Sequence, residues 1–127
     1  MRGILMACGP INVIGAISFL PSFELGRKQL QLPEPDPFYL WILSSWILAF
    51  GIAYFHQGWT GRLNPSVLAL GAWGKLTFAW QMLSLGITRG VPFAIASALP
   101  DLFCGILFCW WLWRLREGSS GNPQLPH

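Results

Sequence analysis

Four long apolar blocks constrain this chain more than any other feature of its sequence. They cover about residues 3–23, 38–55, 66–86 and 91–113, and the short stretches between them hold nearly all of the charge. Each block has about 18–23 residues, and a helix of that length crosses a hydrocarbon core of about 30 Å. We therefore expect an all-α fold: an integral membrane four-helix bundle with four transmembrane helices.

Composition supports the same fold class. Hydrophobic residues make up 54% of the chain and charged residues only 10%, whereas a soluble domain carries roughly 25% charged residues. So little charge leaves too few polar side chains to cover a water-facing surface. The expected surrounding is a lipid bilayer, which the chain crosses as a multi-pass protein.

One transmembrane domain is expected over residues 1–116. The first block follows Arg2 as a signal peptide would, but it is long for one and ends without a small-residue cleavage site. We therefore predict a retained helix that bends or starts at Pro10. Residues 117–127 are rich in Gly, Ser and Pro, a composition typical of a disordered tail.

Polar segments separate the blocks. Residues 24–37 end in alternating prolines, which favour extended backbone, and we expect a short interfacial turn of helix before them. Residues 56–65 are predicted to be a loop, because they contain two glycines and an Asn-Pro pair. Residues 87–90 are predicted to be a tight turn.

Basic residues indicate the orientation of the chain. An even number of spans places both termini on one side of the membrane, and cytoplasmic segments carry an excess of Lys and Arg. The side with the termini has Arg2, Arg62, Arg114 and Arg116, and the other side has Arg27, Lys28 and Arg89. This excess favours cytoplasmic termini.

Two ionisable residues interrupt the apolar blocks near their middles, Lys75 in the third and Asp101 in the fourth. Each would cost roughly 2.5–3.5 kcal/mol at the centre of a membrane helix. Consecutive spans joined by a short turn are antiparallel neighbours, so the two residues reach the same depth. We predict that Lys75 and Asp101 face each other inside the bundle.

Further polar residues lie at the same depth. Asn12 is at the middle of the first block, Ser44 and Ser45 are near the middle of the second, and Gln81 is a weaker candidate in the third. Small residues beside the two charges allow close helix approach in lipid. The candidate site is therefore an intramembrane polar centre to which all four helices contribute.

Three interpretations of this centre remain open. A buried Lys–Asp pair with amide and hydroxyl partners can simply lock helix pairing and register. It can instead be a proton- or substrate-linked site, because intramembrane charges often mark ion and substrate paths. A third interpretation is a pocket for a quinone-like molecule or a lipid.

Other kinds of site are not indicated. The three cysteines, Cys8, Cys104 and Cys109, have no metal-ligand spacing and are expected to be small buried side chains. We expect no metal and no cofactor, and the two histidines do not lie at one depth for a haem. The scattered basic residues form no stripe for nucleic acid.

The tryptophans divide by position. Five lie near block ends and are expected to anchor at the membrane interface, and three lie in mid-span, where packing is expected. Tyr54 is likewise placed in an interfacial belt at the end of the second block. The end set is Trp41, Trp59, Trp110, Trp111 and Trp113, and the mid-span set is Trp46, Trp73 and Trp80.

Short motifs in all four blocks resemble those of a known family. They are Pro10-Ile11-Asn12, Phe50-Gly51-Ile52-Ala53-Tyr54, Gly71-Ala72-Trp73-Gly74-Lys75, and Pro100-Asp101-Leu102-Phe103 with Trp110-Trp111. With its length and layout, the chain resembles small four-span bacterial proteins of the DoxX-like kind. The resemblance implies a four-helix protein of the bacterial inner membrane without a settled activity, and the quinol oxidation associated with the name-giving member is not carried over.

Two other four-span families fit less well. Small multidrug resistance transporters have a glutamate in the first helix, where this chain has Asn12. Fluoride channels have a Gly-rich first helix with an arginine motif that is absent here. Both families are disfavoured.

The leading functional interpretation is a non-enzymatic membrane protein of structural or accessory role, built around Lys75 and Asp101. One alternative is a small proton-coupled transporter or channel-like protein that acts as a homodimer, because four short helices enclose little space alone. Another is an accessory subunit of a larger, quinol-linked redox complex of the membrane. No Ser/His/Asp set or carboxylate pair indicates catalysis.

Overall fold

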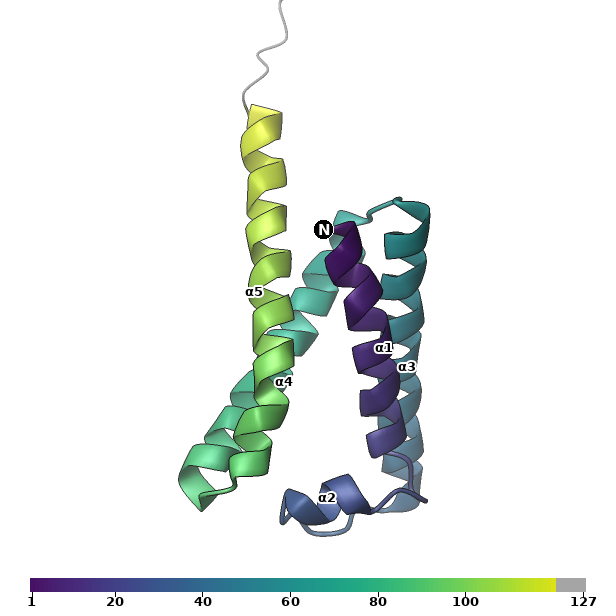
Figure 1. Cartoon of the computed structure of the whole chain (residues 1–127), viewed down its shortest axis with the longest axis vertical. Helices are drawn as coiled ribbons and strands as arrows, with labels where there is room; N and C mark the ends of the chain where they lie inside the picture. The colour runs from purple at the N-terminus through teal and green to yellow at the C-terminus, as the bar shows by residue number, and fades with distance from the viewer. Residues whose placement is uncertain (121–127) are drawn as a thin grey trace, which may run out of the picture.

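The computed structural model describes the backbone of residues 1–120 and the side chains of residues 1–117. The described residues form helices and no strands, so the all-α prediction is confirmed. In chain order, the helices are α1 (Arg2–Ser18), α2 (Leu25–Gln29), α3 (Pro37–Thr60), α4 (Pro65–Arg89) and α5 (Pro92–Ser120) (Figure 1).

Two of the described helices are long and apolar enough to cross a membrane, α3 over Pro37–Thr60 and α5 over Pro92–Glu117. The sequence predicted four spans. α1 has only 17 residues. α4 has 25, but polar residues such as Lys75 and Gln81 interrupt its apolar run.

Local sequence signals explain where the long helices begin and end. Asp36 caps α3 by accepting a hydrogen bond from the Phe38 amide at 2.8 Å. The Asn64 side chain caps α4 by accepting hydrogen bonds from the two backbone amides that follow Pro65. Proline suits the first helical position, because its nitrogen carries no hydrogen and needs no acceptor. Both helices end at a glycine in the left-handed conformation, Gly61 with φ 72° and Gly90 with φ 65°.

Three predicted boundaries are wrong. α3 continues through the first half of the expected loop at 56–65, because Gly58 is a packing residue rather than a turn residue. A Cβ at Gly58 would lie 2.9 Å from the backbone nitrogen of Met6 in α1. α1 does not begin at Pro10, which lies inside it. α5 runs to Ser120, so residues 117–120 of the predicted tail are helical, and its residues 121–127 lie outside the described residues.

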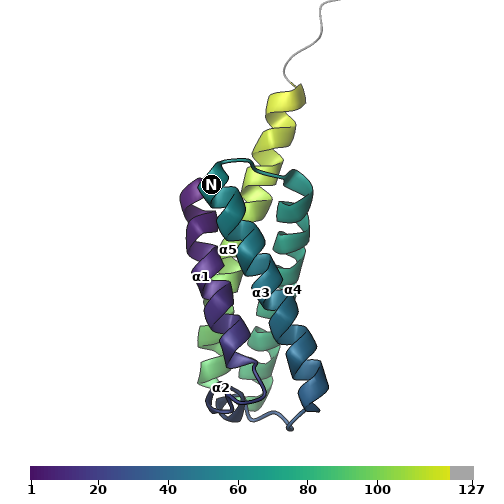
Figure 2. The ribbon, with the colours of Figure 1, turned by 90° about the vertical axis from the view of Figure 1, so that its right-hand side faces the viewer.

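The four long helices are arranged as two pairs rather than as one evenly packed bundle. α1 lies along α3, and α4 lies along α5. The pairs approach each other toward the N-terminus and diverge toward α2, which lies across the open end (Figure 1). Figure 2 shows the second view, in which the C-terminal part of α5 again projects beyond the other helices on the N-terminal side. Both ends of the described chain therefore lie at the same end of the molecule.

Two apolar clusters follow this arrangement. The first joins all four long helices on the N-terminal side, and the second joins Leu30, directly after α2, to α4 and α5 at the other end. The pairs are thus held together on one side and separated by α2 on the other. The first cluster consists of Leu5, Cys8, Tyr54, Leu68, Ala72, Cys104 and Phe108, and the second of Leu30, Ala79, Met82, Val91, Ala94 and Ala98.

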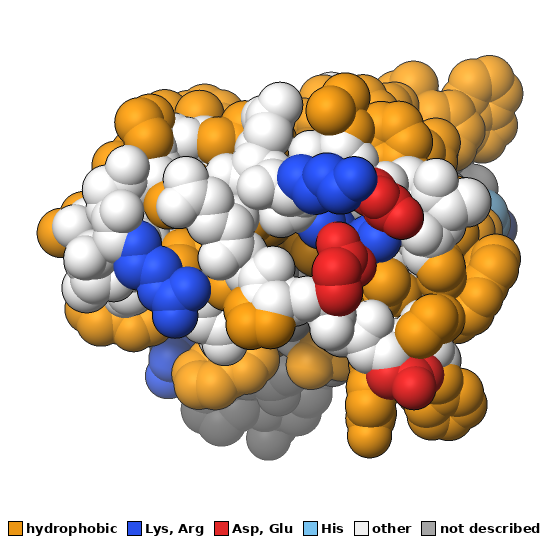
Figure 3. Space-filling model, turned by 90° about the horizontal axis from the view of Figure 1, so that it is seen from below, with side chains coloured by type: hydrophobic (Ala, Val, Ile, Leu, Met, Phe, Trp, Pro, Cys, Tyr) orange, Lys and Arg blue, Asp and Glu red, His pale blue; other side chains and the backbone are white. Residues whose placement is uncertain are grey.

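The outer surface of the long helices is apolar. The three mid-span tryptophans, Trp46, Trp73 and Trp80, are largely exposed, so the prediction that they pack in the interior is wrong. Charged side chains gather instead at the end that carries α2 (Figure 3). A water-soluble monomer rarely exposes apolar side chains so extensively.

Candidate functional site

The structure brings Lys75 of α4 and Asp101 of α5 together. The Nζ atom of Lys75 lies 2.5 Å from Oδ1 of Asp101. The Lys75 side chain is 6% exposed and that of Asp101 is 21% exposed. Antiparallel neighbouring helices place the two residues at one level, as their mid-block positions predicted.

Asn12 of α1 is the third member of this centre. Its Oδ1 accepts a hydrogen bond from Lys75 Nζ at 2.9 Å, and its Nδ2 donates to the Ile47 carbonyl of α3 at 3.2 Å. These two contacts fix which end of the amide faces the ammonium. Asn12 therefore connects the α1–α3 pair to the charges of the α4–α5 pair.

Tyr54 of α3 belongs to the same surroundings, although the sequence placed it in an interfacial belt. It is 2% exposed, and Lys75 Nζ lies 5.7 Å from the centre of its ring, within the range of a cation–π interaction. The ring packs directly over Gly71, where any side chain would collide with it. Tyr54 lies three residues after Gly51 and four residues before Gly58, so all three share one face of α3. This spacing was the sequence signal that the face is directed inward.

The remaining predicted members lie elsewhere. Ser44 is buried between α3 and α1, where its hydroxyl donates to the Ala16 carbonyl at 2.7 Å. Ser45 is exposed and donates to the Trp41 carbonyl of its own helix. Gln81 is exposed as well. α3 thus contributes Tyr54 and the Ile47 carbonyl to the centre, and neither serine.

A cavity of about 460 Å³ lies beside this centre. It is lined by residues of all five helices. Asn12, Tyr54, Lys75 and Asp101 are among the polar residues of its wall. Most other lining residues are apolar. Among them are Ile11, Leu43, Trp46, Phe50, Leu70 and Phe78.

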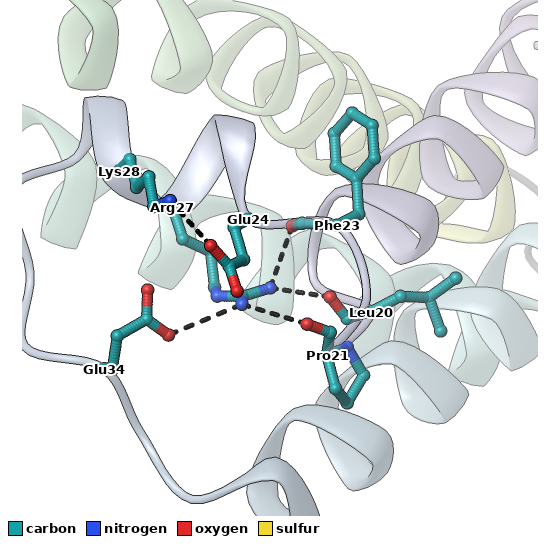
Figure 4. A network of polar contacts seen from close by, with 7 residues as sticks. All are labelled: Leu20, Pro21, Phe23, Glu24, Arg27, Lys28 and Glu34. Atoms are coloured by element: carbon teal, nitrogen blue, oxygen red, sulfur yellow. Dashed lines mark hydrogen bonds and ion pairs between the residues drawn. The ribbon is translucent and has the colours of Figure 1, made fainter.

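Arg27 of α2 also lines the cavity, and Figure 4 shows its polar contacts. Its Nη1 donates to the Leu20 and Phe23 carbonyls at 2.6 and 2.9 Å. Its Nη2 donates to the Pro21 carbonyl at 3.3 Å and lies 3.4 Å from a carboxylate oxygen of Glu34. One buried guanidinium thus organises the loop after α1, and its Nε is buried without a partner among the described residues.

A second lysine–carboxylate pair lies on the outside of α2. Lys28 Nζ is 2.6 Å from a carboxylate oxygen of Glu24, and both side chains are more than half exposed. The hydrogen bond from Lys28 holds the pKa of Glu24 below its ordinary value of 4.5. The same bond raises the pKa of Lys28.

Comparison with known proteins adds nothing to this geometry: no protein-family model matches the chain, and no curated protein or solved structure does. The arrangement itself combines an ammonium, a carboxylate, an amide and a phenol beside an apolar cavity. Such a set can hold the polar head of an otherwise apolar molecule.

Proposed function

We propose that the chain is a multi-pass protein of the cell membrane whose cavity binds one lipid-soluble molecule of the quinone class. The activity proposed is binding and not catalysis. The observation that carries the proposal is the apolar cavity of about 460 Å³ with Lys75, Asp101 and Asn12 on its wall. The likeness to DoxX-like proteins adds the bacterial inner membrane as the expected location.

Support for four membrane passes comes from the direction of the side chains on α4. Its polar and small residues, including Gly71, Gly74 and Lys75, line the cavity. Its outward positions carry Trp73 and Trp80, which are largely exposed. A membrane helix that lines a polar site loses average hydropathy in this way while its outer face stays apolar. At 1.5 Å per residue, α4 is about 37 Å long.

Support for the ligand class comes from the size and the polarity of the cavity. Small-molecule pockets typically have volumes of about 300–1,000 Å³, apolar walls and a few polar groups that fix orientation. The Lys75 ammonium donates hydrogen bonds, and carbonyl oxygens on a planar ring would accept them. The apolar part of the wall, which includes Trp46 and Phe78, would then cover the ring and the start of a tail.

A short-tailed quinone, decylubiquinone, can test binding to the purified chain in mild detergent. Quinones quench tryptophan fluorescence, and Trp46 lines the cavity, so we expect saturable quenching. Gly74→Leu should abolish the saturable part, because Gly74 lines the cavity and a Cβ there meets nothing within 4 Å. The new side chain would project into the cavity and obstruct ligand binding without disturbing the fold.

Gly3→Leu is the matched control. Gly3 also lies on a helix with open space around its Cβ position, but it does not line the cavity. We expect quenching by this variant to equal that of the unmodified chain. Quenching that does not saturate, or that Gly74→Leu leaves intact, would rule out the proposed ligand site.

Topology gives an independent test of the membrane part of the proposal. Epitope tags at both termini should be inaccessible to protease in intact cells and cleaved after the membrane is opened. A tag that is cleaved at only one end would contradict an even number of passes. Cleavage at both ends in intact cells would reverse the proposed orientation.

Proton-coupled transport is a second candidate function, and one observation favours it. The Asp101 carboxylate is 21% exposed and lines the cavity, whereas Lys75 is nearly enclosed. A proton from the cavity would therefore reach Asp101 and break the ion pair. The loss of the ion pair would change how the α1–α3 pair packs against the α4–α5 pair. Vesicles that contain the chain and a pH-sensitive dye should then show a proton flux that Asp101→Asn abolishes. Equal fluxes from both chains would exclude this function.

A further inference from the structure

Two cysteines from different helix pairs meet inside the molecule. Cys8 of α1 and Cys104 of α5 have their Sγ atoms 2.8 Å apart. Both are free thiols, and their exposed fractions are 0% and 5%. The sequence suggested separate buried side chains, because residues 96 positions apart give no spacing signal.

The thiols lie in the apolar cluster where the two helix pairs are closest. Leu5, Tyr54 and Phe108 belong to the same cluster. A sulfur–sulfur bond is about 2.05 Å long, so a small shift of the two side chains would bring the sulfurs to bonding distance. Such a bond would join α1 to α5 and hence the α1–α3 pair to the α4–α5 pair.

The cavity comes within one helical turn of the thiols, although neither cysteine lines it. Asn12 follows Cys8 by four residues, and Asp101 precedes Cys104 by three, so each lies one helical turn from a thiol. Both Asn12 and Asp101 line the cavity. A small neutral oxidant that enters the cavity is therefore within one turn of the sulfurs, whereas the burial of both thiols excludes bulky partners.

We propose that Cys8 and Cys104 are a redox pair that a peroxide converts into a disulfide between α1 and α5. One sulfur attacks a peroxide oxygen, the O–O bond breaks, and a sulfenic acid and water form. The second sulfur then attacks the first, the S–S bond forms, and the S–O bond breaks with release of a second water. For hydrogen peroxide, two thiols lose two electrons and two protons, and the peroxide is reduced to two waters.

The disulfide would fix the helix pairs at their closest point. It would also close a loop of most of the chain, which restricts the unfolded state. The oxidised chain should therefore unfold at higher temperature than the reduced chain. This proposal needs no ligand in the cavity, so it stands apart from the proposed function.

Cys109 provides an internal control, because it lies on α5 outside the pair and is exposed. The test uses the full Cys109→Ser chain in mild detergent, treated with hydrogen peroxide, unfolded, and labelled with a maleimide polymer. We expect the two labels of the reduced chain to fall to none and to return after a reductant. The intact mass should fall by that of two hydrogens.

Other outcomes would overturn the proposal. Both labels retained after peroxide would show that the pair does not react. Mass gains from added oxygen, which a reductant does not reverse, would show damage at separate thiols in place of a bond. In the unmodified chain, oxidised glutathione should add to neither Cys8 nor Cys104, because both are buried, and an adduct at either would contradict the exclusion of bulky partners.

Discussion

The molecule contains two lysine–carboxylate pairs of nearly equal length in opposite surroundings. Lys75 and Asp101 are 2.5 Å apart with side chains 6% and 21% exposed. Lys28 and Glu24 are 2.6 Å apart with side chains 67% and 54% exposed. The N–O distance alone therefore does not distinguish an ion pair that organises the interior from one that lies on the surface of a helix.

Surroundings make the difference between the pairs. Water screens Lys28 and Glu24, and exposed pairs of this kind contribute little to stability. Lys75 and Asp101 have lost most of their water, so each depends on the other and on Asn12. Removing one member of a buried pair leaves an uncompensated charge, which is much more destabilising than the pair is stabilising.

The largest effect is expected from Asp101→Ala. The Lys75 ammonium would lose its counter-ion and keep the Asn12 amide and the Tyr54 ring, so we expect a loss of about 3 kcal/mol in the free energy of unfolding. Unfolding by a denaturing detergent, at neutral pH and from mild-detergent micelles, measures this loss. Glu24→Ala is the matched control at the exposed pair and should leave the unfolding midpoint unchanged.

A smaller effect is expected from Asn12→Leu. This variant removes the hydrogen bond to Lys75 and the one to the Ile47 carbonyl but keeps the ion pair, so the loss should be about 1.5 kcal/mol. The same unfolding titration measures it. A loss as large as that of Asp101→Ala would mean that the amide, and not the carboxylate, balances the ammonium.

Replacing both charges should change stability least among the interior variants. Lys75→Met combined with Asp101→Leu removes the buried charges together, and the free energy of unfolding should stay within about 1 kcal/mol of the unmodified value. Saturable quenching by decylubiquinone should nevertheless disappear. Retained quenching would show that the charged pair takes no part in binding.

The contribution of the exposed pair to stability should depend on pH, and only weakly. The hydrogen bond from Lys28 lowers the pKa of Glu24, so its contribution is present above 4.5 and is lost as the pH falls through the pKa of the folded chain. Carbon NMR of the Glu24 carboxyl should show titration below 4.5, and Lys28→Ala should move it upward. An unchanged titration in that variant would show that the two side chains are not paired in solution.

The sequence predicted the helices, and it predicted the contact between Lys75 and Asp101 for a clear physical reason. An ammonium and a carboxylate in apolar blocks need partners, and a short connection places the two blocks side by side, which pointed to Lys75 and Asp101. Asn12 was identified by its depth, since it lies at the middle of the first block. Serines carry no such constraint, because a hydroxyl can donate to its own helix, as Ser45 does.

Features that depend on the packing of distant helices could not be predicted in this way. Tyr54 looked interfacial because α3 was expected to end at residue 55, whereas it ends at Thr60. Gly58 looked like a turn residue because glycine serves turns and close contacts equally well. The contact between Cys8 and Cys104 follows from the approach of the two helix pairs, which no local pattern encodes.

The most direct test of this account is the coupling free energy of each lysine–carboxylate pair, measured in parallel by double-mutant cycles. Lys75→Met and Asp101→Leu, singly and together, should give a coupling of at least about 2 kcal/mol, because each single variant leaves an uncompensated charge that the double variant does not. Lys28→Met and Glu24→Leu should give a much smaller coupling, because water screens this pair. Equal couplings at the two pairs, or none at Lys75 and Asp101, would contradict the central claim that the interior of this protein is organised around a buried ion pair.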